Sequence, residues 1–509
     1  MARNLLLGID LGTTATKAAL YHLDGTLAGE GRAEVALSYP APGHVEQDMH
    51  DFYESAARAT RLCLASSGAD PRAIAALAFD SQMAGVGALD EDARPPVKFD
   101  SWLDMRCRPY IEDLRTRHGA RITELTGCPP TCAHGPKMMW WRGERPAEYA
   151  RIAKFVMPVC YVAGRMAGLG AEDAFIDYTF LHFTGCADAC QGAWSAELLD
   201  ELGIDGARLP RIVEPWRIVG EVQAEAAQHF GLPAGVPIAA GCGDTAAGAL
   251  GAGVVRPGML LDTAGTASVL AACTDRYCAD TQHCALIVMR SVIPDVWTPL
   301  AYIGGGGLAL PWYRKKLLDA GGGDDLESLD YEQLFKDAEA VPPGCDGLLF
   351  SPHLCGRICP AAPQMRGAWI GFSWGHTQAH FFRAIAESVA YEYAWYLQIL
   401  RELLPDAAFT EARAIGGGAR SAAWNRIKAG VLNVAYRRVS RTESATWGCA
   451  LIAARAVGLI ENMAEVAMET AAVCAEVVAP DPEAQAAYRA ALARYVFWQD
   501  RLQAGFEGS

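Results

Sequence analysis

The stretch of residues 5–17 constrains the fold most, because an apolar run of strand length ends there in a tight turn rich in polar groups. Asp10 follows the apolar run, Gly12-Thr13-Thr14 forms the turn, and Lys17 precedes a second strand-like run at Ala18–Tyr21. A glycine lets backbone amides close on an anion, and threonine hydroxyls can donate to phosphate oxygens. Asp10 would repel a bare phosphate, so the turn fits a phosphate accompanied by a cation, as in a magnesium nucleotide.

A second copy of this pattern occurs about half a chain later, at residues 259–268. It again has an apolar run, then Asp262, and then Gly265 and Thr266 with a further hydroxyl at Ser268. A buried strand and a polar hairpin turn would explain the first stretch equally well if it stood alone. An internal repeat at this distance instead predicts two similar lobes, each presenting a phosphate-binding hairpin to one cleft.

Composition excludes several kinds of partner. The 509 residues are too many for one hydrophobic core, and 44 basic and 59 acidic residues give a formal net charge of −15. No basic cluster is dense enough to follow a nucleic-acid backbone, so we expect no nucleic-acid partner. No apolar stretch approaches the roughly 20 residues of a membrane span. We therefore expect a cytoplasmic protein with no membrane partner, whose 16 cysteines are reduced thiols.

Three pairs of cysteines have the spacing Cys-x-x-x-Cys and could suggest a metal site: Cys128 and Cys132, Cys186 and Cys190, and Cys355 and Cys359. This spacing matches neither the common zinc pattern nor the common iron–sulfur pattern. Four-residue spacing also arises by chance in a chain with this many cysteines. We therefore expect no structural metal at these pairs.

Two polar segments of the first half have the chemistry of a sugar site. Gln82 and Met83 follow a predicted strand, and strand ends are where α/β sheets meet their ligands, although a plain β-turn would explain the same residues. Trp102, Asp104 and Arg106 stand at alternate positions. An aromatic face can cover the C–H groups of a polyol while charged groups bind its hydroxyls. These residues are therefore candidates for the walls of a polyol site.

Two further carboxylates stand alone in apolar surroundings. Asp177 lies among aromatic residues, and the local sequence leaves open whether it is a hydroxyl ligand or a helix cap. Asp244 is the only ionisable residue of the small-residue turn at 241–248, which follows a predicted strand and opens a helix. An isolated acidic group at the mouth of such a turn is suited to accept a proton. Asp244 is therefore the candidate general base.

The same turn also fits a loose dinucleotide-binding fingerprint, Gly241-x-Gly243-x-x-Ala246, with Asp262 near the position of a ribose-binding acid. That fingerprint requires a helix between the glycine loop and the acid, and residues 246–253 can supply only a short one. It also leaves both Gly-Thr hairpins without a role. An NAD-binding oxidoreductase is therefore a remoter alternative.

Two glycine-rich segments of the second half precede predicted helices. Gly304–Gly307 comes before a helix that starts near Leu310, and Gly416–Gly418 comes before a helix that contains Trp424. Backbone amides at the start of a helix are a usual place for phosphate, although a flexible loop would also explain the first segment. Three consecutive glycines let a flat base or a ribose lie against the main chain. Both segments are therefore candidates for nucleotide contact.

Taken in order, these motifs resemble those of the FGGY carbohydrate kinases, and most closely those of the xylulokinase group. The similarity runs from about Leu5 to Gly458. Each motif is weak alone, but the ordered set is specific. The motifs that carry it are Gly8-Ile9-Asp10-x-Gly12-Thr13-Thr14, Val45-Glu46-Gln47-Asp48, Gln82-Met83, Trp102-x-Asp104-x-Arg106, Gly241-x-Gly243-Asp244, Gly265-Thr266 and Gly416-Gly417-Gly418-Ala419-Arg420-Ser421.

The resemblance implies an α/β fold of two ribonuclease-H-like lobes, of the actin and hexokinase type, around a central cleft. It implies a sugar-binding lobe at residues 1–248 and a nucleotide-binding lobe at residues 249–509. It also implies that Asp244 is the general base and that Asp10 helps to hold Mg²⁺. The implied ATP contacts are Gly12, Thr13, Thr14, Lys17, Gly265, Thr266, Gly307, Pro311, Gly417, Gly418 and Ala422. The implied sugar contacts are Gln82, Met83, Trp102, Asp104 and Asp177.

The resemblance implies an enzyme that transfers the γ-phosphoryl group of ATP to a sugar hydroxyl, with D-xylulose as the first candidate substrate. Two departures fall where the sugar should be recognised. Ala84 stands where typical bacterial xylulokinases have histidine, and Gly356-Arg357 stands where they have Gly-Glu-Arg. Ribulose, erythritol, glycerol and gluconate are therefore alternative substrates, and an ATPase of the same superfamily that uses no sugar is a third class. Homodimers are common in the family, so a second copy of the chain is a candidate partner.

Overall fold

The strands of the first half of the chain form one main sheet. The computed structural model describes residues 3–265, 268–318 and 331–507. The sheet contains β1 (Leu5–Leu11), β2 (Ala15–His22), β3 (Leu27–Glu34), β5 (Ile74–Ser81), β13 (Ile218–Glu221) and β14 (Pro237–Ala239). Their order is β13-β14-β5-β1-β2-β3, and β15 (Cys242–Gly243) pairs with β5 outside this path.

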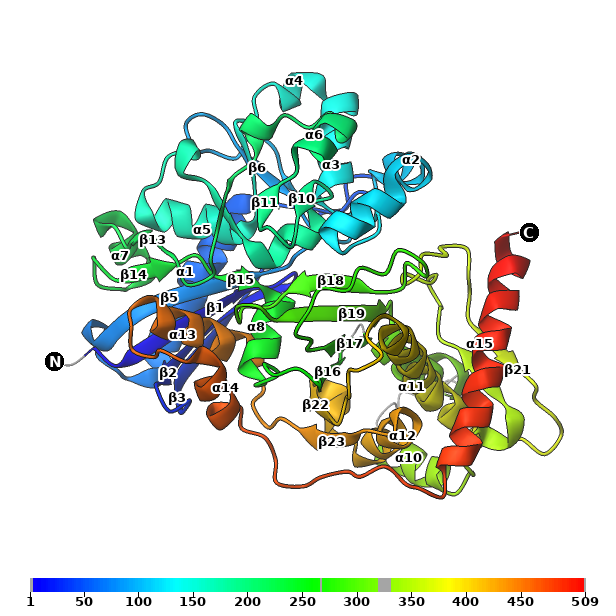
Figure 1. The fold of residues 1–509 in the computed structure, drawn as a ribbon. Helices are drawn as coiled ribbons and strands as arrows, with labels where there is room; N and C mark the ends of the chain where they lie inside the picture. Colours follow the sequence, from blue (N-terminus) through cyan, green and yellow to red (C-terminus); the bar gives the residue numbers. More distant parts are fainter. Residues whose placement is uncertain (1–2, 266–267, 319–330, 508–509) are drawn as a thin grey trace.

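The second half forms a sheet of the same design. It contains β16 (Met259–Ala264), β17 (Ser268–Ala272), β18 (Ile287–Arg290), β19 (Trp297–Ile303), β22 (Glu411–Ile415) and β23 (Ala435–Arg438), in the order β18-β19-β17-β16-β22-β23. The strand β16 is antiparallel to β17 and parallel to β22, just as β1 is antiparallel to β2 and parallel to β5. The prediction of two similar ribonuclease-H-like lobes is therefore confirmed (Figure 1).

The two faces of β1 contact different parts of the molecule, because successive side chains of a strand point to opposite sides. Leu7 and Ile9 belong to the same core cluster as Phe52 of α1 (Met49–Ser67). Gly8 instead faces α13 (Ser444–Ala456), where a Cβ atom would collide with the Thr446 carbonyl oxygen. Asp10 has the same parity as Gly8, so it points toward the side from which the C-terminal half approaches.

The helices α13 and α8 (Asp244–Gly251) pack closely against each other between the two sheets (Figure 1). A Cβ atom on Gly251 would collide with the Ser444 carbonyl oxygen, and one on Gly448 would collide with the Ala247 carbonyl oxygen. Glycine at both positions therefore permits the close approach. The predicted lobe boundary between residues 248 and 249 falls inside α8, and the division of the chain into lobes stays a prediction.

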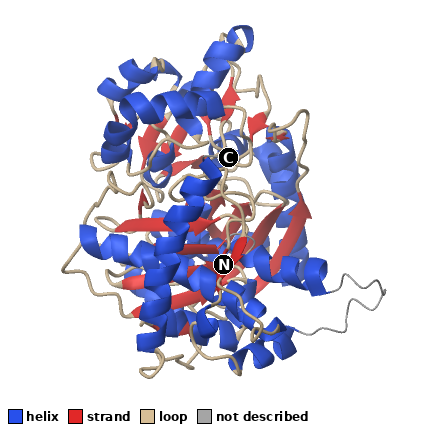
Figure 2. Cartoon of the chain, turned by 90° about the vertical axis from the view of Figure 1, so that its right-hand side faces the viewer, coloured by secondary structure: helices blue, strands red, loops and turns tan. Residues whose placement is uncertain are grey.

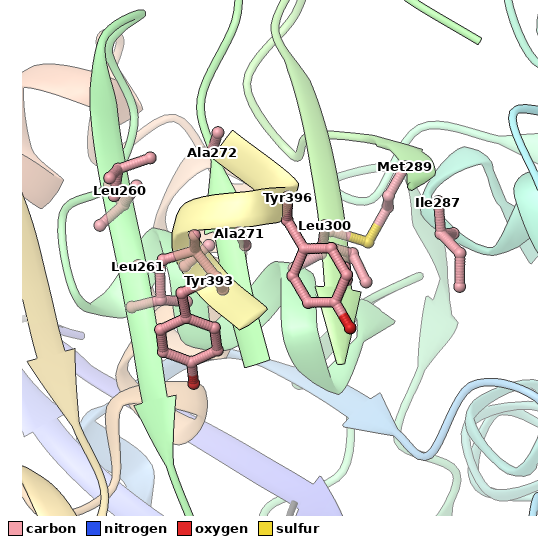
Figure 3. Packing of buried hydrophobic residues seen from close by; sticks show 14 of the residues in the cluster. Leu260, Leu261, Ala271, Ala272, Ile287, Met289, Leu300, Tyr393 and Tyr396 are labelled. Carbon is pink, nitrogen blue, oxygen red and sulfur yellow. The ribbon is translucent and has the colours of Figure 1, made fainter. Parts of the chain in front are cut away.

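The helix α11 (Gln378–Leu403) covers the C-terminal sheet. Figure 3 shows Tyr393 and Tyr396 of this helix lying over Leu260 and Leu261 of β16 and Leu300 of β19. One side of this helix is buried, as shown by the low exposure of Phe382, Ala386, Val389, Tyr393 and Leu397. The core of this lobe therefore forms between one long helix and the sheet.

A helical layer covers the outer end of the N-terminal lobe (Figure 1). It includes α2 (Arg108–Thr126), α3 (His134–Glu144) and α6 (Ala196–Leu202). Figure 2 shows the strands in the interior and helices on the outside. Among the described residues, no helix is both long and apolar enough to cross a membrane.

Candidate active site

The turn of the first hairpin has Asp10 at its entry and Lys17 at its exit. The two residues are register partners across β1 and β2, and Lys17 Nζ lies 3.5 Å from Asp10 Oδ2. A Cβ atom on Gly12 would lie 2.7 Å from the Ala15 carbonyl oxygen, so the tight turn requires glycine there. Thr14 is exposed beside it. The turn therefore offers a hydroxyl to a ligand next to a carboxylate and an ammonium group.

Three carboxylates gather at the base of this hairpin, those of Asp10, Asp80 and Asp244. Asp80 is the register partner of Asp10 on the parallel strand β5, and its Oδ2 accepts a hydrogen bond from Cys449 Sγ at 3.0 Å. Within the described residues, no group donates a hydrogen bond to Asp80 Oδ1. Burial, and then the charges of Asp10 and Asp244, raise the pKa of Asp80 well above its usual value. The cluster therefore concentrates negative charge that nearby protein groups do not fully neutralise.

Asp244 is the first residue of α8 and lies at the partly exposed edge of this cluster. Its Oδ1 accepts a hydrogen bond from Thr245 N at 2.6 Å. Burial, and then the charge of Asp10, raise the pKa of Asp244 to about 7, although the hydrogen bonds from Thr245 act in the opposite direction. A carboxylate with a pKa near neutrality can take up and release a proton at physiological pH. This environment suits a general base.

The carboxylates of Asp10 and Asp80 are suited to a magnesium ion that also binds phosphate. In the described part of the chain, no group of three or more Asp, Glu, His or Cys side chains is arranged to hold a metal by itself. Magnesium, however, usually keeps several waters and takes one or two protein carboxylates together with substrate phosphates. Asp10, with the donor-free oxygen of Asp80 behind it, has the chemistry of such a site.

Gln82 and Trp102 are held against the turn of the first hairpin. Trp102 Nε1 donates a hydrogen bond to Thr13 Oγ1 at 2.9 Å. Gln82 Nε2 donates to Gln47 Oε1 at 2.8 Å, and Gln47 Nε2 donates to the Thr13 carbonyl oxygen at 2.9 Å. The structure therefore brings two of the predicted sugar residues beside a predicted phosphate residue, although they are 69 or more positions apart in sequence (82 − 13 = 69).

Met83 contacts the residue that precedes Asp244, and Asp177 is linked to that residue through Thr179. The Met83 side chain packs on Gly243, where a Cβ atom would collide with it. Asp177 Oδ1 accepts from Thr179 N at 2.8 Å, and Thr179 Oγ1 accepts from Gly243 N at 2.9 Å. Asp177 thus caps the short helix η3 (Tyr178–Phe183), which is one of the two roles that its local sequence allowed. Burial raises the pKa of Asp177 to about 7, and its role as a hydroxyl ligand stays a prediction.

Asp104 and Arg106 form a buried ion pair in the loop that carries Trp102. Both Asp104 oxygens accept hydrogen bonds from Arg106 Nε, and Oδ2 also accepts from Val45 N at 2.6 Å. Arg106 Nη2 also donates to Glu46 Oε1 at 2.7 Å. The donors around Asp104 leave its oxygens little capacity for a sugar hydroxyl. Direct sugar contact by Asp104 stays a prediction, and its observed contacts hold the loop together.

The turn of the second hairpin is enclosed by glycines from two other segments. Thr266 lies outside the described residues, and Gly265 beside it is partly exposed. A Cβ atom on Gly307 would collide with the Gly265 carbonyl oxygen, and one on Gly418 would lie 2.7 Å from Ala264 Cβ. Both predicted glycine-rich segments therefore converge on this turn.

The remaining predicted nucleotide residues flank these glycines. Gly417 is exposed, and a Cβ atom there would meet open space. Pro311 lies in α9 (Ala309–Tyr313), which follows the short helix η5 (Gly306–Leu308) that contains Gly307, and Ala422 is the exposed first residue of α12 (Ala422–Leu432). These positions form an open edge next to the second hairpin. Their contact with ATP stays a prediction.

Asp262 does not fit the dinucleotide alternative. Its carboxylate is buried, forms an ion pair with Lys428 Nζ, and accepts a hydrogen bond from Tyr393 at 3.1 Å. It is therefore unavailable to a ribose. The helix between the glycine turn and this acid, α8, is only eight residues long. The interpretation as an NAD-binding protein is wrong on both grounds.

Arg357 is not a residue of the sugar wall. It is buried in the C-terminal lobe, where its Nη2 lies 3.4 Å from Glu392 Oε2 and its guanidinium lies 4.3 Å from the Trp395 ring centre. The residue therefore serves the packing of α11. Of the two departures noted in the sequence, only Ala84 lies next to Gln82 and Met83.

Sequence reasoning assigned no role to Asp80 or Glu443. Glu443 Oε2 accepts a hydrogen bond from Lys17 at 2.7 Å, across a sequence separation of 426 residues. No local signal could have found that contact. For Asp80 a signal was present, because it is a carboxylate that directly follows an apolar run of strand length, as Asp10 does.

Comparison with known proteins agrees with this arrangement. Residues 5–251 match the model of the FGGY family of carbohydrate kinases, N-terminal domain, and residues 260–457 match that of its C-terminal domain. The xylulose kinase of Bacillus subtilis (strain 168) is 26% identical over 466 residues, which cover 91% of this chain and 90% of that protein. The gluconokinase of the same strain is also 26% identical over 466 residues, which cover 90% and 88%.

A solved structure with the same fold is the xylulose kinase from Rhodospirillum rubrum. It superposes with a TM-score of 0.88 at 26% identity and covers 99% of this chain and 100% of that chain. The two family domains account for most of the sequence, in the order that the two lobes require. The chain therefore belongs to the FGGY family of carbohydrate kinases.

Proposed function

We propose that the enzyme transfers the γ-phosphoryl group of Mg-ATP to a hydroxyl of a ketopentose, with D-xylulose as the first candidate and D-xylulose 5-phosphate as its product. The position of Asp244 carries the proposal. Asp244 follows Gly243, on which Met83 packs, and it is close enough to Asp10 for that charge to raise its pKa. A hydroxyl bound beside Met83 would therefore have the base on one side and the phosphate hairpin on the other.

Asp244 would accept the proton of the attacking hydroxyl. Its pKa of about 7 is high enough for it to bind this proton as the phosphoryl group is transferred. The hydrogen bond from Thr245 N fixes the carboxylate at the start of α8. The position of the base is therefore determined by the backbone of a helix rather than by a mobile loop.

Transfer would depend mainly on positioning and on neutralising charge. Gly12, Thr13 and Thr14 would bind phosphate oxygens through their amides and hydroxyls, and Lys17 would add a positive charge. Bound Mg²⁺ would neutralise Asp10 and polarise the phosphate oxygens. Closure of the two lobes would exclude water, which competes with the sugar as acceptor.

The choice of sugar is the least constrained part of the proposal. Relatives named as a xylulose kinase and a gluconokinase are equally identical to this chain, at 26%, so overall similarity does not select a substrate. Ala84 shortens the side chain next to the Gln82-Met83 wall and leaves more room there than histidine would. Another ketose or polyol, such as ribulose, erythritol, glycerol or gluconate, is therefore the alternative.

The test is ADP release from Mg-ATP with a panel of ketopentoses, pentitols, glycerol and gluconate. Asp244→Asn is the matched variant, since it keeps the shape of the side chain and removes the base. We expect turnover to fall by roughly 10²- to 10⁴-fold while nucleotide binding, measured by calorimetry, is retained. Full activity of the variant would overturn the assignment of the base.

The panel also separates the alternatives. Turnover with D-xylulose above all others would support the first candidate, and turnover with another polyol only would assign the altered specificity to the wall that contains Ala84. ATP hydrolysis that no sugar stimulates would favour the ATPase class. The predictions of a cytoplasmic enzyme and of a homodimer stay predictions.

A further inference from the structure

One face of α3 contacts two loops of the proposed sugar site: the loop that carries Gln82 and Met83, and the loop that carries Trp102. His134, Lys137 and Trp141 are spaced by three and four residues, so they lie on the same side of this helix. All three make hydrogen bonds to the segments at 83–84 and 100–101. None of these three residues was a candidate from the sequence.

The contacts to the wall are made mostly to backbone oxygens. His134 Nε2 lies 2.5 Å from the Met83 carbonyl oxygen. Lys137 Nζ donates to the Ala84 carbonyl oxygen at 3.0 Å and to the Ser101 carbonyl oxygen at 2.6 Å. One ammonium group therefore joins the loop that carries Gln82 and Met83 to the loop that carries Trp102.

The protonation state of His134 supports a fixed hydrogen bond. Burial lowers the pKa of His134 to about 4, so the ring is neutral at pH 7 and only one of its nitrogens bears a hydrogen. A carbonyl oxygen can only accept, so that hydrogen is on Nε2. The neutral His134 ring therefore donates to Met83 O throughout the pH range above its pKa in which the enzyme is folded.

Lys137 is costly to bury, and this indicates a specific role. Its side chain is fully buried, and burial lowers the pKa of the ammonium group, while Asp100 acts in the opposite direction. Asp100 is itself bound by Trp141 Nε1 at 2.6 Å and lies 3.4 Å from Arg106. A buried charge is tolerated when it is paired and hydrogen-bonded. The Lys137 ammonium group donates its hydrogen bonds to the two loops of the proposed sugar site.

We propose that Lys137 and His134 are positioning residues for the sugar. They act through the backbone of residues 83–84 and 101, and set the separation between the Gln82-Met83 segment and Trp102. This inference rests on the proposed function, because it assumes that these two loops hold the substrate. It predicts that loss of the hydrogen bonds weakens sugar binding selectively and leaves nucleotide binding unchanged.

The chain offers a matched control for Lys137 in the same lobe. Lys154 Nζ also donates to two backbone oxygens, those of Ala207 at 2.8 Å and Leu209 at 3.4 Å, and neither belongs to the proposed site. A purely structural role of such a lysine would have the same kinetic consequences at either position. The comparison of Lys137→Met with Lys154→Met therefore isolates the effect on the sugar.

The experiment measures KM for the best sugar of the panel, KM for ATP, kcat and Tm in both variants. For Lys137→Met we expect the sugar KM to rise roughly ten- to hundredfold, the range that a hydrogen bond to a charged group supports. The KM for ATP should change less than twofold, and Lys154→Met should leave both KM values unchanged. An unchanged sugar KM in a folded Lys137→Met enzyme would overturn the proposal.

A second pair of variants decides the case in which Lys137→Met does not fold. His134→Gln keeps a neutral N–H donor near the Met83 carbonyl oxygen, whereas His134→Leu removes it. We expect a higher sugar KM in the leucine variant and a value near that of the wild type in the glutamine variant. Equal KM values in the two variants would contradict the proposal. Failure of the proposed function is distinguishable, since the wild-type enzyme itself would then show no sugar-dependent ADP release.

Discussion

The hairpins of the two lobes share one sequence pattern and one topology, but their aspartates have opposite environments. Asp10 stands beside Asp80 and Asp244, at a turn that is open to a ligand. Asp262 is buried and paired with Lys428, with Tyr393 as a hydrogen-bond donor. Asp10 therefore lies among other acidic groups, whereas Asp262 is neutralised by a lysine inside the core.

The residues that surround each aspartate explain the difference. In the first lobe, the neighbours of Asp10 on β2 and β5 are Lys17 and Asp80. In the second lobe, the equivalent neighbours of Asp262 on β17 and β22 are Leu270 and Ala414. A duplicated hairpin therefore serves as a charged site in one lobe, where Asp80 stands beside Asp10, and as a structural ion pair in the other, where Lys428 of α12 (Ala422–Leu432) reaches Asp262.

The strongest test of this contrast is Asp10→Asn. We expect kcat to fall roughly 10³-fold, because the Mg²⁺ that Asp10 would hold between itself and the phosphate loses a carboxylate ligand. Tm should stay the same or rise, because the variant removes a charge that repels Asp80 and Asp244. Steady-state kinetics and thermal unfolding measure the two effects. A destabilised enzyme with normal turnover would mean that Asp10, too, is a structural residue.

The corresponding variant of the second lobe is Asp262→Asn, and it should lower the stability of the enzyme rather than its turnover. It leaves the Lys428 ammonium buried without a carboxylate, which costs about 3–5 kcal/mol of unfolding free energy. Denaturant unfolding measures this loss. The control is the double variant Asp262→Leu/Lys428→Met, which removes both charges and should be more stable than Asp262→Asn. A loss below about 1 kcal/mol in the single variant would contradict the assignment of a structural ion pair.

A pH experiment extends the contrast to another acid of the C-terminal lobe. Although burial opposes it, Arg357 and His353 lower the pKa of Glu392 from 4.5 to about 2. The folded state therefore binds fewer protons than the unfolded state, so the stabilisation is complete above about pH 4.5 and is lost as the pH falls toward 2. Between pH 5 and pH 3 we expect a loss of about 2 kcal/mol that Glu392→Gln does not show.

The control for this experiment is Glu402→Gln, since Glu402 lies on the same helix but has 63% of its side chain exposed. The pH dependence of unfolding by urea should be the same in this variant as in the wild type. If the pH dependence of the unfolding free energy decreased equally in both variants, Glu392 would not be the source of the acid sensitivity.

The smallest effect is expected for Glu443→Gln, at the contact between the two halves of the chain. Lys17 would keep Asp10 at 3.5 Å and lose the stronger contact to Glu443 at 2.7 Å. Both side chains are partly exposed, so the cost in stability should be below about 1 kcal/mol. We expect KM for ATP to change by less than about fivefold, as measured by ADP release. A loss of activity as large as that of Asp10→Asn would assign Glu443 to the catalytic machinery.

Local patterns were sufficient to locate the two phosphate-type hairpins as elements of the fold. Apolar runs that end in an aspartate and a Gly-Thr turn located both hairpins. The exceptions are residues whose partners are distant in sequence. Arg357 lies in a motif near the expected sugar segment but packs on α11, and Lys137 looks like an ordinary helical lysine until its two carbonyl acceptors are seen.

The sequence by itself determined the family and the two-lobed α/β fold, because these depend on strand periodicity, glycine turns and the order of motifs, and it proposed Asp244 as the general base. Only the tertiary structure decided that Asp10 has Asp80 beside it while Asp262 has Lys428, and that Lys137 of α3 donates hydrogen bonds to the backbone of Ala84 and Ser101. The physical reason is that electrostatic environment and burial arise from residues on adjacent strands and helices, whose pairing no local stretch of sequence specifies.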